Sequence, residues 1–293
     1  MFSLLIPVYN EPESIEATLK SAQDVLITLG EDYEIIVIND GSTDNTGEIL
    51  SKIDIPHCKV IRHPRNLGYG ASMKTGIRHS VGDYIGTTDA DSTYPIEQIK
   101  PMLMEMRSKE ADMIVGARTK KGVQIPLIRR PAKAVVNTLA NILVGMKIPD
   151  LNSGLRIFKR DMAERYMHLY PQGFSFTMTI TLAALTNHHI VEYYPIDYFK
   201  RQGTSSMSSG LNGVKHFVNF INLIIRIVMY FRPLRFFMWP SALLMLSGIA
   251  LMYHTITIDN NISDAGLLLL MSGLQIGLFG FLADIIVRHR QSN

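Results

Sequence analysis

Two aspartates follow an apolar run in the stretch YIGTTDADSTYP, residues 84–95. Asp89 and Asp91 are separated by one alanine and stand where a buried strand would leave the protein core. Carboxylates in such a place either bind hydroxyl and amide groups of a ligand or hold a hard cation such as Mg²⁺, which takes one or two carboxylates together with phosphate oxygens. We interpret the pair as a platform for a metal ion and a diphosphate, because the cation would neutralise the charge that develops as a diphosphate leaves.

Two earlier apolar segments end in polar residues of a similar kind. PVYNE, residues 7–11, follows the first segment, and NDGSTD, residues 39–44, follows the second. Strand-like and helix-like segments alternate through residue 165, which predicts an α/β fold with a mostly parallel sheet covered by helices on both faces. Ligands of such sheets bind beyond the carboxyl ends of the strands. We therefore expect the three polar segments to converge at one edge of the sheet.

The last part of the chain is strongly apolar. Residues 236–258 contain no Asp, Glu, Lys or Arg, and residues 265–287 contain only Asp284. Each run is long enough for a tilted helix to cross a hydrocarbon layer of about 30 Å. The polar turn DNNISD joins them, so we predict a transmembrane hairpin; a pair of buried helices in a soluble protein is the alternative.

The residues around the two runs predict how the hairpin is oriented. Arginines flank both outer ends, whereas the turn carries two Asp and no Lys or Arg, so the positive-inside rule places the N-terminal domain and both termini in the cytoplasm. Residues 206–235 combine a broad apolar face with interspersed polar residues, which favours amphipathic helices in the membrane interface over a helix packed on the domain. The predicted division is therefore a catalytic domain at 1–205, interfacial helices at 206–235 and a hairpin at 236–290.

Composition narrows the class of protein further. A formal net charge of +3 is too small to argue for a nucleic-acid partner. The single cysteine, Cys58, excludes an internal disulfide and fits a reducing compartment. The first residues, MFSLLIPVYNEPES, lack the basic region of a signal peptide and turn polar after nine residues, so we expect none.

The order of these motifs resembles the family-2 glycosyltransferases of the GT-A fold. The closest resemblance is to the polyprenyl-phosphate glycosyltransferases, which include dolichyl-phosphate mannose synthase and bacterial undecaprenyl-phosphate glucosyltransferases. It covers nearly the whole chain, because further segments follow in the family's order: RNLGYGASMKTGI, GAR at 116–118, SGLRIFKR at 153–160, GFSF at 173–176 and the hairpin. The resemblance implies a hexosyltransferase that moves one sugar, with inversion, from a nucleoside diphosphate (UDP or GDP) to undecaprenyl or dolichyl phosphate at the cytoplasmic membrane face.

The resemblance also implies roles for acidic and neutral residues. Asp89 and Asp91 become the aspartates that hold Mg²⁺ or Mn²⁺ and the sugar diphosphate. Relatives often have Gln two residues after the second aspartate as another metal ligand. This chain has Thr93 at that position, so the resemblance does not extend to this contact. Four residues are assigned to the nucleotide pocket: Pro7, Tyr9, Glu11 and Asp40.

Several cations also fall at positions of the family. The resemblance places Arg118 near the donor phosphates and Arg201 on a mobile loop that closes over the donor. Arg129, Arg130 and Lys133 suit the acceptor phosphate, since a phosphate monoester beside a diphosphate needs positive charge nearby. For each of them an ordinary surface cation is the alternative.

The acceptor half lacks one feature that sugar-hydroxyl acceptors require. Residues 166–191 contain no Asp or Glu, whereas transfer to a hydroxyl needs a general base, commonly a carboxylate. A lipid phosphate has a second pKa near ~6 and is already a competent nucleophile. The absence of a base and the presence of the hairpin therefore both favour a lipid phosphate as the acceptor. Arg156, in the same half, is interpreted as a structural cation that holds it to the sheet.

Two other functions use similar domains. A processive polysaccharide synthase would carry a Gln-x-x-Arg-Trp motif and several membrane spans, but the one tryptophan, Trp239, follows RFFM and only two spans are predicted. A non-catalytic nucleotide-sugar sensor or membrane scaffold is the other alternative. The sugar, the prenyl length, the metal and the oligomeric state stay open; UDP is mildly favoured by the two-span architecture, and the family resemblance suggests a tetramer.

Overall fold

The computed structural model describes residues 1–119, 141, 145–173, 175–199, 225, 229 and 233–291. Seven strands in this part form one sheet in the order β3-β2-β1-β4-β6-β5-β7. All neighbouring pairs are parallel except the two that involve β6, which runs antiparallel to both β4 and β5. This confirms the mostly parallel sheet. The strands are β1 (Phe2–Val8), β2 (Tyr33–Asn39), β3 (Cys58–Arg62), β4 (Tyr84–Thr87), β5 (Met113–Ala117), β6 (Arg156–Lys159) and β7 (Val191–Pro195).

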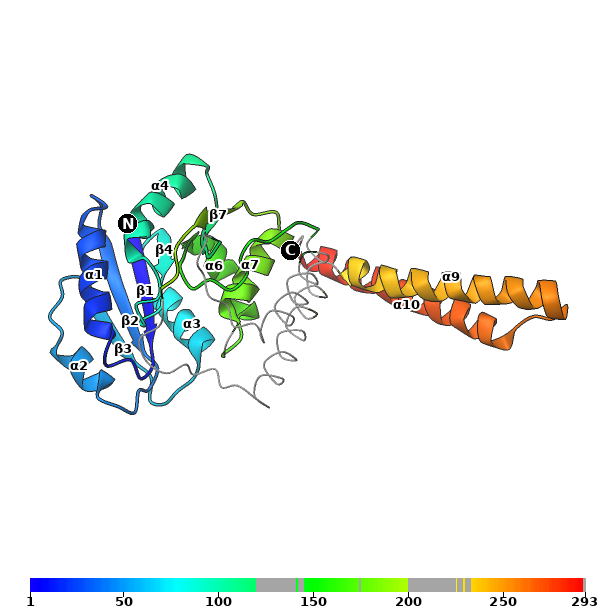
Figure 1. Ribbon diagram of the computed structural model, residues 1–293, viewed down its shortest axis with the longest axis horizontal. Coiled ribbons are helices and arrows are strands. Elements are labelled where there is room, and N and C mark those ends of the chain that lie inside the picture. The colour runs from blue at the N-terminus through cyan, green and yellow to red at the C-terminus, as the bar shows by residue number, and fades with distance from the viewer. Residues whose placement is uncertain are drawn as a thin grey trace.

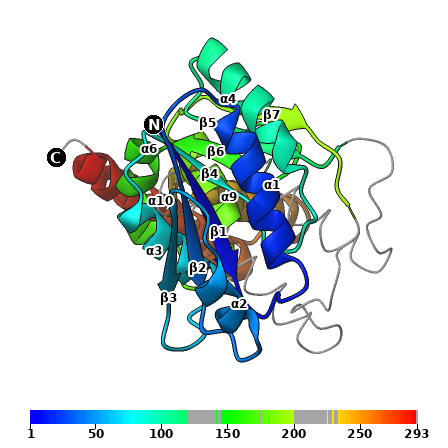
Figure 2. The same cartoon turned by 90° about the vertical axis from the view of Figure 1, so that its left-hand side faces the viewer.

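Helices cover both faces of the sheet (Figures 1 and 2). In β1, Leu5 belongs to one buried cluster while Leu4 and Ile6 belong to the other, because successive side chains of a strand point to opposite faces. The first cluster includes residues of α3 (Tyr69–His79), α6 (Arg160–Arg165) and α7 (Phe176–Thr186). The second includes residues of α1 (Ile15–Ile27), α2 (Thr46–Lys52) and α4 (Ile99–Ser108), with the short turns η1 (Ile96–Gln98) and η3 (Met167–Leu169) completing the domain.

Helix α7 is buried along its whole length, and a buried cation ties it to the sheet. Arg156, the first residue of β6, has no exposed surface. Its Nη1 donates to the Thr177 carbonyl at 2.8 Å and to Thr181 Oγ1 at 3.0 Å, while Nε and Nη2 both donate to the Ser153 carbonyl. These bonds satisfy a guanidinium that would otherwise be costly to bury. They agree with the structural role expected for Arg156.

Two long helices extend away from the domain side by side (Figure 1). They are α9 (Pro233–Asp259) and α10 (Asp264–Gln291), and the predicted spans 236–258 and 265–287 lie within them. Both are apolar enough to cross a membrane, with mean hydropathy of 1.6 and 1.9, and only 11% and 22% of their most apolar windows are buried. The large exposure argues against a buried soluble pair. The predicted interfacial helices at 206–235 fall almost entirely outside the described residues.

Small residues let the two helices approach closely. A Cβ atom at Gly273 would lie 2.9 Å from the Met245 nitrogen, and Ser241 Oγ donates a hydrogen bond of 2.7 Å to the Gly273 carbonyl. Such contacts are a usual means of joining helices where lipid removes the hydrophobic driving force. At the domain end of α9, Phe236 packs against the cluster that contains α3 and α7.

We predict that Arg156→Met destabilises the domain. The substitution leaves the buried Ser153 carbonyl without its Arg156 donors, which costs about 1 to 3 kcal/mol for an unsatisfied group, whereas the Thr177 carbonyl keeps a bond from Thr181 Oγ1. The midpoint of thermal unfolding in detergent measures the loss. Arg160→Met is the matched control, because Arg160 makes only an i,i+4 pair with Glu164 at 2.8 Å near the surface, of the kind worth about 0.3 to 0.5 kcal/mol. Equal midpoints for the two variants would contradict the structural role of Arg156.

Candidate active site

The carboxyl ends of the parallel strands bring the predicted acidic segments to one edge of the sheet (Figure 2). Backbone N–H groups of the first segment donate hydrogen bonds to side chains of the second segment and of the start of α2. Asn10 N donates to Ser42 Oγ at 3.1 Å, and Glu11 N donates to Thr46 Oγ1 at 3.0 Å. Because β6 is antiparallel, its beginning lies at this same edge, so residues 153–156 join the site as well.

Asp91 is the more deeply buried of the two aspartates that follow β4, with 7% of its surface exposed. Its Oδ1 accepts hydrogen bonds from Thr93 Oγ1 at 2.6 Å and from Thr93 N at 3.2 Å. The Thr93 carbonyl in turn accepts a bond from Phe199 N at 2.9 Å. Thr93 therefore orients Asp91, a role that the sequence comparison with Gln-bearing relatives did not suggest.

Asp89 is half-buried and lies against the backbone of Gly154. A Cβ atom built on Gly154 would be 2.9 Å from each carboxylate oxygen of Asp89. The phenol of Tyr69 is buried close to the same carboxylate: burial raises its pKa well above the ordinary value, and the negative charge of Asp89 raises it further. Tyr69 thus stays protonated beside Asp89.

Asp40, expected in the nucleotide pocket, is buried and already bonded within the protein. Its Oδ1 lies 2.7 Å from His63 Nδ1 and accepts a bond from Leu67 N at 2.9 Å, while Oδ2 accepts a bond from Gly68 N at 2.8 Å. The carboxylate thus fixes residues 63–68 ahead of α3. Any contact with a base or ribose would be made in addition to these bonds.

The other residues expected in the nucleotide pocket are more accessible. Pro7 is half-buried near the end of β1, Tyr9 has 37% of its surface exposed, and Glu11 is half-buried. All of them lie at the same edge as Asp91. The structure therefore brings these three positions together, but it does not show what they bind.

Arg118, expected near the donor phosphates, forms a bidentate ion pair with Asp150. Nε and Nη2 donate to the two carboxylate oxygens at 2.8 and 2.9 Å, and the Arg118 backbone N–H adds a bond of 3.1 Å. The guanidinium carbon also lies 5.2 Å from the centre of the Tyr198 ring. Burial by itself would raise the pKa of Asp150, but the bonds and charge of Arg118 outweigh it, so the pKa is lowered.

Asp150 is thus a site residue that the sequence did not reveal. It stands in the loop before β6, and its partner Arg118 follows β5. Two strands that are antiparallel neighbours bring these loops together, which no local motif signals. The remaining predicted cations, Arg129, Arg130, Lys133 and Arg201, lie outside the described residues.

The donor set at this edge fits a hard divalent cation that completes its coordination elsewhere. Asp89 and Asp91 offer carboxylate oxygens, the ligands that Mg²⁺ prefers. Within the described ranges, no group of three or more His, Cys, Asp or Glu residues is arranged to hold a metal. A cation here would therefore depend on one or two carboxylates plus oxygens from a bound diphosphate.

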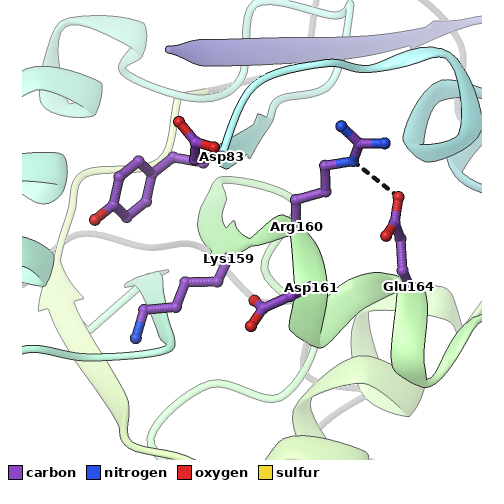
Figure 3. Close-up of a pocket in the computed structure, with 6 residues that line it drawn as sticks. Asp83, Lys159, Arg160, Asp161 and Glu164 are labelled. Atoms are coloured by element: carbon purple, nitrogen blue, oxygen red, sulfur yellow. Dashed lines mark hydrogen bonds and ion pairs between the residues drawn. The ribbon is translucent and has the colours of Figure 1, made fainter.

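A separate pocket of about 390 Å³ lies at the opposite end of β4 (Figure 3). Its charged side chains are partly paired with one another and with the domain: Arg160 bonds to Glu164 at 2.8 Å, and Lys159 bonds to Asp112 at 2.8 Å. These pairs stabilise the start of α6 and the end of β6. The pocket is distinct from the acidic edge.

The mixed sheet, covered by helices on both faces and acidic along one edge, has the architecture of the GT-A fold. The profile of glycosyl transferase family 2 matches residues 3–167, and the profile of the GtrB C-terminal hairpin matches residues 232–288. The chain belongs to glycosyl transferase family 2 and carries a GtrB-type C-terminal hairpin.

Named relatives agree with this assignment. The low-salt glycan biosynthesis hexosyltransferase Agl6 of Haloferax volcanii is 29% identical over 221 residues, which are 73% of this chain and 51% of Agl6. The chain thus spans about half the length of this curated relative. Two solved structures share the fold: S. aureus TarS 1–349 with UDP-GlcNAc, and glucosyl-3-phosphoglycerate synthase of Mycobacterium tuberculosis with Mn²⁺, UDP and phosphoglyceric acid.

The structural likeness extends over most of the chain. TarS has a TM-score of 0.58 at 20% identity and is matched over 77% of this chain and 66% of its own. The synthase has a TM-score of 0.60 at 16% identity, with 78% of each chain covered. At these identities the likeness establishes the GT-A fold, and not the substrates.

We predict that Arg118→Met is strongly destabilising near neutral pH, and that the deficit shrinks in acid. Removing Arg118 leaves Asp150 buried without its cation, which costs about 3 to 5 kcal/mol. In the wild type the folded pKa of Asp150 is depressed, so the pair's contribution is complete above the unfolded pKa of about 3.9 and is lost only as pH falls through the lower folded value. In the variant burial raises this pKa, so protonation favours the folded state as pH falls from about 8 to about 5.

Unfolding midpoints of wild type and variant across that pH range measure the effect. Arg107→Met is the control, because Arg107 pairs with Glu31 at 2.7 Å but keeps 41% of its side chain exposed, a setting in which pairs contribute about 0 to 1 kcal/mol. A deficit in Arg118→Met that does not change with pH would show that Asp150 is not the group responsible.

Proposed function

We propose that this enzyme transfers a single sugar from a nucleoside diphosphate, preferentially UDP, to a polyprenyl phosphate at the cytoplasmic membrane face, with Mg²⁺ or Mn²⁺ as cofactor. The observation that carries the proposal is that the acidic edge of a family-2 domain and an apolar helical hairpin belong to one chain. The acidic edge supplies a place for a sugar diphosphate. The hairpin brings the enzyme to lipid.

The donor is proposed from the chemistry of the acidic edge. Asp89 and Asp91 would hold the divalent cation, and the cation would offset the negative charge of the departing diphosphate. The hydrogen bond of 2.6 Å from Thr93 Oγ1 to Asp91 Oδ1 fixes this carboxylate before any ligand binds. Asp91 therefore needs little reorganisation on binding. The UDP-GlcNAc complex of TarS and the UDP complex of the mycobacterial synthase support a nucleotide donor for this fold.

The acceptor is proposed from the hairpin and from the composition of the neighbouring half of the domain. Helix α7 consists of apolar residues and threonines, and residues 166–191 contain no carboxylate. A phosphate acceptor needs orientation and charge compensation rather than a base. The cations Arg129, Arg130 and Lys133 are proposed to provide that compensation.

The reaction is proposed to be one displacement. An oxygen of the acceptor phosphate attacks the anomeric carbon, the bond from that carbon to the donor's β-phosphate oxygen breaks, and the nucleoside diphosphate leaves with the bonding electrons. The new bond forms on the opposite side of the sugar, so the configuration inverts. Arg118 and Arg201 are proposed to contact the donor phosphates, Arg118 while remaining bonded to Asp150.

The membrane topology and domain division remain part of the proposal. We place the catalytic domain (1–205) and the outer ends of the hairpin (236–290) on the cytoplasmic side, with 206–235 in the interface. A tetramer is an expectation from the family resemblance alone.

We predict that Asp91→Asn and Asp89→Asn each reduce transfer about 100- to 1,000-fold, the size of effect seen when one stabilising group is removed from a transition state. The assay follows radiolabelled sugar from a panel of UDP and GDP donors into extractable polyprenyl lipid, with Mg²⁺, Mn²⁺ or chelator. Asp83→Asn is the matched control, because Asp83 lies at the opposite end of β4 and its side chain is 81% exposed.

The same screen separates the alternatives. Full activity in Asp91→Asn would refute the metal role, and label that appears in polymer instead of lipid would favour a processive synthase. A wild-type enzyme that transfers no sugar from any donor would overturn the proposal in favour of a binding protein.

We predict that Asn261, in the turn between α9 and α10, lies on the side of the membrane opposite the domain. Asn261→Cys should react with an impermeant maleimide from outside intact cells, whereas Lys20→Cys, on the exposed surface of α1, should not. Burial raises the pKa of the Cys58 thiol to about 11, so this native cysteine reacts slowly at neutral pH, and Cys58→Ser removes it altogether. Labelling of position 261 only after the cells are opened would reverse the proposed topology.

A further inference from the structure

Gly154 lies immediately before β6 and faces the segment that carries the two aspartates. Its backbone does not adopt a left-handed conformation, so the local conformation does not require glycine. The requirement must come from the space around its Cα atom.

Residues on both sides of the aspartate pair hold the Gly154 peptide in place. Thr87 Oγ1 donates a hydrogen bond of 2.6 Å to the Gly154 carbonyl, and Gly154 N donates one of 2.7 Å to the Tyr94 hydroxyl. Both bonds are buried. The loop from Thr87 to Tyr94 is therefore fastened to Gly154 at its two ends, and Asp89 lies between them.

The carboxylate of Asp89 occupies the position that a side chain at 154 would need. A Cβ atom there would lie 2.9 Å from Oδ1, 2.9 Å from Oδ2 and 3.0 Å from Cγ. The three nearly equal distances mean that the flat carboxylate faces the Gly154 Cα. Even a methyl group would thus push the carboxylate away.

Two buried tyrosines stand near this carboxylate. Tyr69 has a buried hydroxyl, and Tyr94 is 5% exposed. Gly154 lies against the Asp89 carboxylate, and the hydroxyl that holds the Gly154 peptide belongs to the buried Tyr94.

We propose that Gly154 is a positioning residue for catalysis: the absence of a side chain at 154 fixes the Asp89 carboxylate in the orientation that receives the donor diphosphate and its cation. The inference rests on the proposed function. It assigns part of the enzyme's specificity for a metal–diphosphate ligand to the backbone at Gly154. Gly154 itself touches no reacting atom; it acts through Asp89.

The first test is Gly154→Ala, with Gly173→Ala as the matched control, because a Cβ atom at Gly173 would meet nothing within 4 Å. Binding of Mn²⁺ in the presence of UDP, followed by the paramagnetic signal of free Mn²⁺, should weaken about 10- to 100-fold in Gly154→Ala, the usual effect of losing a group that orients a ligand. Sugar transfer should fall by a similar factor. Gly173→Ala should match the wild type in both measurements.

The second test asks whether the methyl group collides with Asp89 and not with another group. Gly154→Ala should lower the unfolding midpoint in the wild type and in Asp89→Asn, whose side chain has the same size. It should cost much less in Asp89→Ala, where the space is vacated. If Gly154→Ala alone fails to fold, the double variant with Asp89→Ala should fold.

The outcomes separate this inference from the proposed function. An equal thermal cost in all three backgrounds, or wild-type Mn²⁺ binding in Gly154→Ala, would overturn the positioning role. If the wild type binds no Mn²⁺ and transfers no sugar, the proposed function fails, and the thermal comparison still decides whether Gly154 sets the position of Asp89.

Discussion

The antiparallel insertion of β6 between β4 and β5 is the constraint on which the site depends. A parallel strand in that place would begin at the opposite edge of the sheet. Because β6 runs the other way, the residues that lead into it meet the ends of both neighbours. Gly154 thereby reaches Asp89, Asp150 reaches Arg118, and Arg156 reaches α7. Three separate contacts of the site thus have one topological cause.

The charges at this edge explain why a cation belongs to the proposed chemistry. The positive charge of Arg118 is balanced by Asp150 at 2.8 Å, so it adds little net charge to the site. Asp89 and Asp91 are carboxylates, and a carboxylate next to a diphosphate repels it. A divalent cation between the carboxylates and the diphosphate converts that repulsion into attraction. The electrostatics of the described residues and the proposed metal dependence are therefore consistent.

The sequence was sufficient to predict the elements whose signals are local. Apolar periodicity indicated the parallel strands and the hairpin, and the acidic strand ends indicated the edge where Asp91 lies. The reversed strand β6 and the partners it brings were not predicted, because Thr87 and Gly154 are 67 residues apart and meet only through the strand order. Thr93 was read as a missing metal ligand, although its hydroxyl is what fixes Asp91. Asp40 was assigned to the nucleotide by resemblance, and its bonds to residues 63–68 depend on a loop whose path the sequence does not specify.

The hairpin is joined to the site through the hydrophobic core. Phe236, in the first turn of α9, packs against the same cluster that contains Phe176 of α7. At the adjacent Arg235, Nη1 lies 2.8 Å from where a Cβ atom on Gly145 would be. Helix α7 also receives the bonds of Arg156, which begins β6 beside Gly154. A continuous set of packed groups thus runs from the base of the hairpin to the residue beside Asp89, so core packing sets the position of the hairpin relative to the acidic edge.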